Sequence, residues 1–185
     1  MIRFDRLTQG AKEALQGAQE LLRNLHHNQL DVEHLLRVLA AQEGVGQEIL
    51  KAIGVDIPRL LWELDQLLDA RPKANGTALS TVYITPRLDE VFQAAEAEAK
   101  RLRDDYVGVD HLLIAIARDP GPELGRLLSR HGITPDAVYT ALRQVRGAQR
   151  VDSPASEERY QILQKYGVNL TEICLLYTSD AADEG

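Results

Sequence analysis

The sequence predicts an all-α protein in which two tandem four-helix repeats pack as one domain with pseudo-twofold symmetry. The stretch Leu30-Asp31-Val32-Glu33-His34-Leu35-Leu36 returns as Val107-Gly108-Val109-Asp110-His111-Leu112-Leu113, so that Glu33 and His34 recur as Asp110 and His111 at an interval of 77 residues. Apolar residues follow the helical period in each copy, and no segment alternates convincingly as a strand. A repeat of about 70 residues has a marginal core by itself, so we expect the two copies to pack together.

The first repeat, about 1–70, is expected to contain four helices. Thr8 is a candidate N-cap of the first helix, whose apolar face runs from Ala11 to Leu25. Asp31 is a candidate N-cap of the second helix, at about 32–41. A third helix at about 47–53 ends at Gly54, a typical left-handed cap, and a fourth follows Asp56 with five leucines along its length.

The second repeat, about 84–146, follows a hinge at 69–83 that lacks helical periodicity. Thr85 is its first candidate N-cap and is followed by Pro86, which suits the first position of a helix. Leu88 and Val91 continue the apolar face of that helix, 77 residues after Ala11 and Ala14. Further helices are expected at about 109–117, 122–130 and 135–146.

Composition excludes several classes of function. The net charge is −7 and no basic cluster is present, which argues against a nucleic-acid partner. The one cysteine, Cys174, provides neither a disulfide framework nor a thiolate metal site. No apolar run reaches the length of a membrane span and the N-terminus lacks a signal-peptide core, so we expect no membrane association and a cytoplasmic location.

No catalytic pattern stands out. The sequence contains no Gly-x-x-x-x-Gly-Lys phosphate loop, no His-Glu-x-x-His zinc pattern and no nucleophile elbow. We therefore expect no enzyme activity, no cofactor and no metal in this chain. A small all-helical enzyme stays open as the alternative class, and nucleotide hydrolysis by the purified chain would reveal it.

The repeated motif, the Leu-Thr start of each copy and the Gly-Val-Asp turn resemble the amino-terminal (Clp N) domain of Hsp100/Clp ATP-dependent unfoldases. The resemblance covers about 1–146. Residues 158–172, from Glu158 to Glu172, look like the segment that leads into the first ATPase module of ClpB-type disaggregases. The resemblance thus implies that 147–173 is a linker with a short helix, ahead of an ATPase module that this chain lacks.

The last twelve residues, 174–185, depart from the family pattern. They resemble translated sequencing-adapter readthrough, so we expect a non-native tail on a truncated fragment, with a genuine divergent end as the alternative. Residues after Arg146 are expected not to pack into the domain. The stretch 147–156 is expected to be a mobile linker and 174–185 to be disordered. The segment after Arg146 is short, and a lone helix of about ten residues is marginal in water.

The resemblance implies a substrate-recruiting domain of a ClpB-type disaggregase that binds unfolded or aggregated polypeptide for ATP-driven threading. The alternative is a ClpC- or ClpA-type domain that binds adaptor proteins or phosphoarginine-tagged proteins for a Clp protease. In the family, ATP, magnesium, hexamer formation and cooperation with an Hsp70-type co-chaperone belong to the longer parent. We therefore expect this chain to be a monomer.

The resemblance also implies site residues. Positions matching Thr8, Asp104 and Asp110 are linked to substrate handling in ClpB-type domains, and positions matching Thr8, Glu33, Thr85 and Asp110 to phosphoarginine recognition in the ClpC branch. Asp110 is shorter than the family's usual Glu, which weakens the second role. A shallow apolar groove would involve Leu88, Val91 and Tyr106.

Each of these residues also has a purely structural interpretation. Thr8 and Thr85 are also expected as N-caps, and Glu33 and Asp110 as acids that the helix dipole favours in a first turn. Leu88 and Val91 fit a core. His34 and His111 are interpreted as partly buried histidines, each satisfied by a neighbouring backbone group, because the duplication would require the same packing twice.

Overall fold

The computed structural model describes residues 2–76, 80–147 and 151–158, and these form the predicted all-helical fold. Four α-helices come from the first repeat, with α1 at Gln9–Asn24, α2 at Val32–Ala41, α3 at Val45–Ile53 and α4 at Ile57–Asp69. Four come from the second, with α5 at Pro86–Arg101, α6 at Val109–Arg118, α7 at Pro122–Arg130 and α8 at Pro135–Arg146. A 3-10 turn, η1 at Phe4–Arg6, precedes them.

The helices begin where the sequence predicts. Thr8 and Thr85 accept hydrogen bonds from the amides of Ala11 and Leu88, as N-caps do, and Asp31 caps α2. Gly54 ends α3 in the left-handed conformation. The one shift in the first repeat is at α3, which takes in Val45 and Gly46 instead of starting after them.

The two repeats are joined by exchanged backbone pairing, which the sequence did not predict. Two-residue strands β1 (Gln29–Leu30) and β2 (Tyr83–Ile84) run parallel, with Leu30 opposite Ile84. An isolated parallel bridge joins Leu7 to Val107. Leu30 corresponds to Val107 and Ile84 to Leu7, each 77 residues away, so the second pair repeats the first with the two repeats exchanged. This reciprocity is what a pseudo-twofold axis between the repeats requires.

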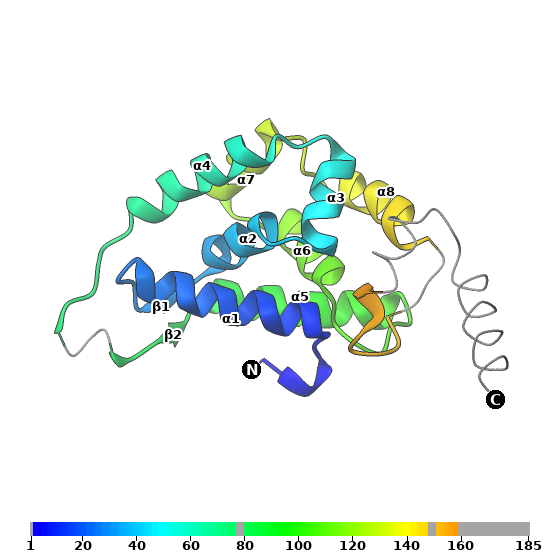
Figure 1. Cartoon of the computed structure of the whole chain (residues 1–185), viewed down its shortest axis with the longest axis horizontal. Helices are drawn as coiled ribbons and strands as arrows, with labels where there is room; N and C mark the ends of the chain where they lie inside the picture. Colours follow the sequence, from blue (N-terminus) through cyan, green and yellow to red (C-terminus); the bar gives the residue numbers. More distant parts are fainter. Residues whose placement is uncertain (1, 77–79, 148–150, 159–185) are drawn as a thin grey trace, which may run out of the picture.

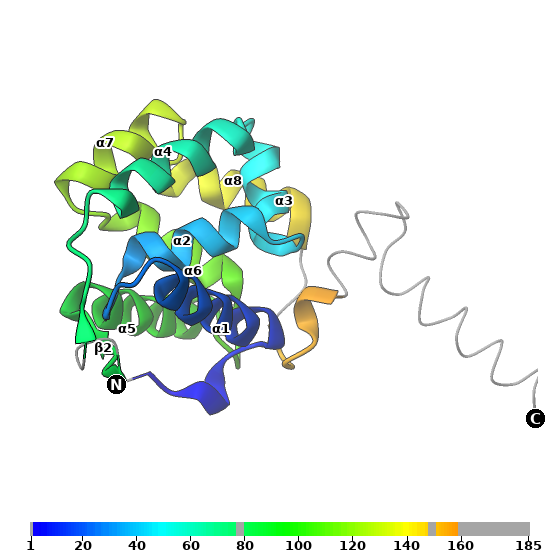
Figure 2. The ribbon, with the colours of Figure 1, turned by 60° about the vertical axis from the view of Figure 1, so that its left-hand side comes forward.

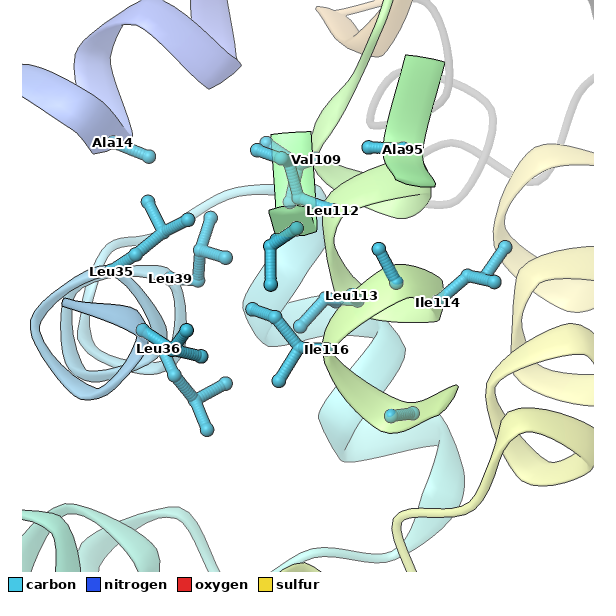
Figure 3. Packing of buried hydrophobic residues seen from close by; sticks show 14 of the residues in the cluster. Ala14, Leu35, Leu36, Leu39, Ala95, Val109, Leu112, Leu113, Ile114 and Ile116 are labelled. Atoms are coloured by element: carbon cyan, nitrogen blue, oxygen red, sulfur yellow. The ribbon is translucent and has the colours of Figure 1, made fainter. Parts of the chain in front are cut away.

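The same exchange governs helix packing. The central helices α2 and α6 lie next to each other, α1 contacts α6 as α2 contacts α5, and α3 packs along α8 (Figure 1). In Figure 2, α1 and α5 lie at one end of the molecule, α4 and α7 lie at the other, and α2 and α6 lie between them. Leucines of α2 and apolar residues of α6 point toward one another in the shared core (Figure 3). A single core therefore serves both repeats.

Candidate functional site

The repeated motif forms the first turns of α2 and α6. His34 and His111 are completely buried, and the Nδ1 atom of each accepts a hydrogen bond from a backbone amide three residues earlier. These donors are Asp31 at 3.1 Å and Gly108 at 2.8 Å. The structural interpretation of the two histidines is confirmed, although their burial is complete rather than partial.

The other nitrogen of each histidine has a different partner in each repeat. His34 Nε2 lies 2.9 Å from His27 Nδ1, whereas His111 Nε2 lies 2.8 Å from Asp104 Oδ2. Burial and the charge of Arg71 lower the pKa of His34 to about 4. Burial also lowers the pKa of His111, but the carboxylates of Asp110 and Asp104 outweigh it and raise that pKa.

In the first repeat, an acidic pair at the start of α2 binds two arginines. Arg71 donates to Asp31 at 2.9 Å and to Glu33 at 2.5 Å. Arg87 donates to the same two carboxylates at 3.1 Å. Thr85 donates from its hydroxyl to Asp31 at 2.7 Å. These five residues are called the repeat 1 cluster.

In the second repeat, one arginine, Arg146, binds two acidic residues, Asp104 and Asp110. It donates to Asp110 at 3.1 Å and also to Asp104, and both carboxylates are buried. Burial raises the pKa of Asp104, but the hydrogen bonds from His111 and Arg146 outweigh it and leave that pKa lowered. Asp110 Oδ1 accepts no hydrogen bond from any described residue. Asp104, Asp110 and Arg146, together with Thr8 and Glu157, are called the repeat 2 cluster.

Glu157 brings a carboxyl group to the start of α6 from outside both repeats. Its Oε1 atom accepts from the Thr8 hydroxyl at 2.6 Å and from the Val109 amide at 2.9 Å. Its side chain therefore caps α6, which Gly108 cannot do. Burial, reinforced by the charge of Asp110, raises the pKa of Glu157 to about 7 even though these two hydrogen bonds favour the charged form.

Two glycines make room for this carboxyl group. Gly10 and Gly108 stand 77 residues from Arg87 and Asp31, so the second site lacks the side chains that fill the first. A Cβ atom on Gly10 would lie 1.9 Å from Glu157 Oε2, and one on Gly108 would lie 2.7 Å from Oε1. Glu157 therefore occupies space that the internal symmetry of the chain would otherwise fill.

The residues before Glu157 are also held against the domain. Residues 151–157, called the linker segment, lie beside the start of α1 and appear in orange in Figures 1 and 2. Val151 is fully buried; its carbonyl accepts from the amides of Asp105 and Tyr106, and its own amide donates to Asp104 at 2.9 Å. The carbonyl of Pro154 accepts from the Gln9 amide at 2.9 Å.

The expectation that nothing after Arg146 packs on the domain is therefore wrong for residues 151–157. This stretch is held by backbone hydrogen bonds, by the apolar side chain of Val151 and by the carboxyl group of Glu157. The expectation considered only the stability of an isolated helix, which does not depend on such contacts. The start of the predicted short helix is seen at 156–158. The rest of that helix, and the tail at 174–185, lie outside the described residues.

The structure sorts the predicted site residues into two places and a core. Thr8, Asp104 and Asp110 come together in the repeat 2 cluster, and Glu33 and Thr85 belong to the repeat 1 cluster. Leu88 and Val91 are 0 % and 5 % exposed, so packing accounts for them in this conformation and they offer no surface to a client. Tyr106 is partly buried and lines a cleft of about 380 Å³ together with Asp104 and three basic residues, Arg6, Lys100 and Arg103.

Sequence reasoning missed the partners of these acids, which are Arg71, Arg87, Arg146 and Glu157. Three of them lie at or beyond the end of a predicted element, where no periodicity marks them. One signal was available, because Gly10 and Gly108 break the 77-residue correspondence with two charged residues. Such a break indicates that the two sites are filled differently.

Two features are absent from the described residues, 2–76, 80–147 and 151–158. No helix there is both long enough and apolar enough to cross a membrane. No group of three or more His, Cys, Asp or Glu side chains in this part of the chain is arranged to hold a metal ion.

Comparison with known proteins agrees with this architecture. The chain is 35 % identical to the chaperone protein ClpB of Bacillus anthracis over 170 residues, and 36 % identical to ClpB of Clostridium perfringens over 173 residues. These alignments cover 90 % and 91 % of this chain but only 20 % of either relative. The chain thus spans about a fifth of the length of the curated relatives that it matches.

Solved structures show the same fold. The Hsp104 N-terminal domain from Candida albicans superposes with a TM-score of 0.69 at 21 % identity, covering 82 % of this chain and 98 % of that one. The N-terminal domain of the chaperone ClpD from Arabidopsis thaliana gives 0.60 at 20 % identity, covering 77 % and 98 %. The family model described as the Clp repeat (R) N-terminal domain matches residues 6–131, and the chain belongs to that family.

Proposed function

We propose that this domain recruits unfolded or aggregated polypeptide for a ClpB-type disaggregase, which would thread it in an ATP-driven step. The helical Clp repeats would be the recruiting module of a longer protein. ATP, magnesium, hexamer assembly and contact with an Hsp70-type co-chaperone belong to that longer protein. The purified chain is then a monomeric binding module without catalytic activity.

The choice of client rests on one observation: Glu33 and Asp110 are both bound by arginines of this chain. A phosphoarginine platform would need these acids to receive a guanidinium group from the tagged protein. Instead, Arg71 and Arg87 already bind Glu33, and Arg146 already binds Asp110. A tagged arginine would have to displace an internal ion pair in each repeat and leave a buried charge to be compensated. This supports polypeptide recruitment over the phosphoarginine alternative.

The two repeats also differ in a way that a symmetric platform would not require. The repeat 2 cluster contains three of the residues expected to handle substrate, Thr8, Asp104 and Asp110. Asp110 Oδ1 accepts no hydrogen bond from the described residues, but the side chain is completely buried in this conformation, so a client would reach it only after the cluster opens. We therefore place recruitment in the second repeat.

The test is a titration of the full chain against one permanently unfolded protein and one phosphoarginine peptide. We expect the unfolded protein to bind and the peptide not to. Asp110→Asn removes the charge at nearly constant volume and should weaken client binding more than the matched change Glu33→Gln. Both variants must be compared well below their melting temperatures. Equal effects at the two positions, or preferential binding of the phosphoarginine peptide, would favour the alternative.

A further inference from the structure

The linker segment contacts the same residues that are expected to handle substrate. Thr8 donates to the carboxyl group of Glu157, and Asp104 accepts from the amide of Val151. Asp110 lies close enough to Glu157 to contribute to the rise of its pKa. A site expected to hold a client polypeptide therefore already holds polypeptide from the same chain.

The way the segment is held shows what the site accepts. Four amides of the domain donate to it, namely those of Gln9, Asp105, Tyr106 and Val109. Three of them meet backbone carbonyls, which every peptide has, and the fourth meets a carboxyl oxygen. Three of its side chains are buried, the apolar Val151, Ser156 and the acidic Glu157 six residues after Val151. The Ser156 hydroxyl donates within the segment, to the Ser153 carbonyl at 2.8 Å, whereas the Glu157 carboxyl group binds the domain. These requirements are loose enough for many sequences to meet them.

The space around Glu157 is open enough for exchange. Gly10 and Gly108 leave the carboxyl group without the flanking side chains present in the first repeat. A cavity of about 170 Å³ borders it and is lined by Gly10, Glu13, Gly46 and Val109, among others. Hydrogen bonds at this site connect one carboxyl group to the domain and do not fix the rest of the side chain. A second carboxyl group could therefore take the same two donors once the first has left.

We infer that the repeat 2 cluster is a peptide site for a segment that carries an apolar residue, then turns, and carries an acidic residue six positions after the apolar one. The linker segment is its internal occupant. Client and linker compete for the site. The apparent association constant of the client is therefore its intrinsic value multiplied by the fraction of molecules in which the linker is released. The inference rests on the proposed function, since it names the chemistry and the regulation of the same site.

The first test measures occupancy in the full chain by amide hydrogen exchange. In Glu157→Ala, the amides of Gln9, Tyr106 and Val109 should exchange at least about tenfold faster, as expected when a buried hydrogen-bonded carboxyl group is lost. The amide of Val107 donates to Arg6 and should stay protected. Glu158→Ala is the matched control, because Glu158 is exposed and neighbours Glu157. Equal exchange in the two variants would overturn the assignment of the occupant.

The second test measures competition with a synthetic peptide of residues 151–158. It should bind Glu157→Ala at least about tenfold more tightly than the unchanged chain, because the site is vacated. The same peptide with alanine in place of Glu157 should bind neither. Gly10→Ala distinguishes an empty site from an accessible one. Its methyl group would push aside the carboxyl group of Glu157, in the linker and in the peptide alike, while alanine is a better helix former than glycine. Equal peptide binding by the unchanged chain and Glu157→Ala would refute the inference.

An unfolded client separates this inference from the proposed function. Stronger client binding by Glu157→Ala, reversed by the synthetic peptide, supports both. Client binding that is unaffected by Glu157→Ala contradicts the inference and leaves the proposed function standing. Absence of client binding in every variant defeats the proposed function, while the exchange and peptide results still judge the internal occupant.

Discussion

Asp31 and Glu157 place a carboxylate oxygen in the same position in the two repeats, although only Asp31 belongs to a repeat. Asp31 Oδ1 accepts from Thr85 Oγ1 at 2.7 Å and from the Val32 amide at 2.8 Å. Glu157 Oε1 accepts from Thr8 Oγ1 at 2.6 Å and from the Val109 amide at 2.9 Å. One is fixed by the backbone of its own helix turn, and the other arrives on a segment that can leave.

Docking of the linker segment should depend on pH. Burial raises the pKa of Glu157 from 4.5 to about 7, so the docked state holds the proton more tightly than the released state. Its contribution to docking is complete below pH 4.5 and is lost as the pH rises through 7. Exchange of the Tyr106 amide, corrected for intrinsic rate, should therefore accelerate across this range beyond the correction.

Glu157→Gln provides the control for that pH series. Its amide oxygen can accept from Thr8 and Val109 without carrying a charge, so the linker should stay docked at pH 8 and the pH dependence should disappear. If the unchanged chain and Glu157→Gln show the same profile, another group controls docking.

Most of the fold could be predicted from the sequence because the signals that define each repeat are local. Each helix cap and apolar face is set by residues a few positions apart, and eight helices lie within about two residues of their predicted bounds. The paired strands at Gln29–Leu30 and Tyr83–Ile84 were not predicted, since two residues are too few to show an alternation of apolar and polar residues. The long-range pairing of Leu7 with Val107 has no local signature at all.

The site was predictable only in part. Family resemblance placed Thr8, Asp104 and Asp110 together, and the structure shows that they share a cluster. The charge partners depend on tertiary contacts, because Arg146 reaches back 36 residues to Asp110 and Glu157 reaches back 149 residues to Thr8. No periodic pattern encodes such distances, so the linker was expected to be free.

Arg146→Ala should destabilise the domain strongly. It leaves the buried carboxylates of Asp104 and Asp110 without their cation, and removing one member of a buried ion pair typically costs about 3–5 kcal/mol. Urea unfolding of the full chain measures the loss. Arg71→Ala is the control in the first repeat and should cost less, because Arg87 still binds both Asp31 and Glu33. Equal losses would show that Arg146 is not the main counter-charge of its cluster.

The two equivalent histidines should titrate far apart. His34 has its pKa lowered to about 4 by burial and by Arg71, whereas the pKa of His111 is raised above 6.5. His34 stays neutral in the folded state, so the stability it contributes is present above pH 6.5 and is lost as the pH falls through 4. The ring-proton shifts in NMR spectra give both midpoints directly.

His27→Asp tests the cause of that difference. It places a carboxylate beside His34 in the way that Asp104 lies beside His111, and the midpoint of His34 should therefore move upward. An unchanged midpoint would mean that burial and Arg71 alone determine the pKa of His34.

Rebuilding the first site inside the second tests whether the two glycines decide where the linker goes. In Gly10→Arg combined with Gly108→Asp, the new aspartate should cap α6 and the new arginine should bind it and Asp110, as Arg87 binds Asp31 and Glu33. Asp110 Oδ1 must shift to admit the new side chain, since a Cβ atom on Gly108 would lie 2.6 Å from it. With Thr8 and Val109 now bound to the aspartate, Glu157 loses both donors.

We expect the double variant to keep the melting temperature of the unchanged chain within a few degrees while the amides of Gln9 and Tyr106 lose their protection. The new carboxylate replaces the hydrogen bonds that the linker made to α6, so the domain itself loses little. Gly108→Asp alone is the informative intermediate, because it adds a further buried acid beside Asp110 and Glu157 without a second cation and should be less stable than the double variant. A double variant whose Gln9 and Tyr106 amides stay protected would show that Val151 and the backbone contacts hold the linker without Glu157.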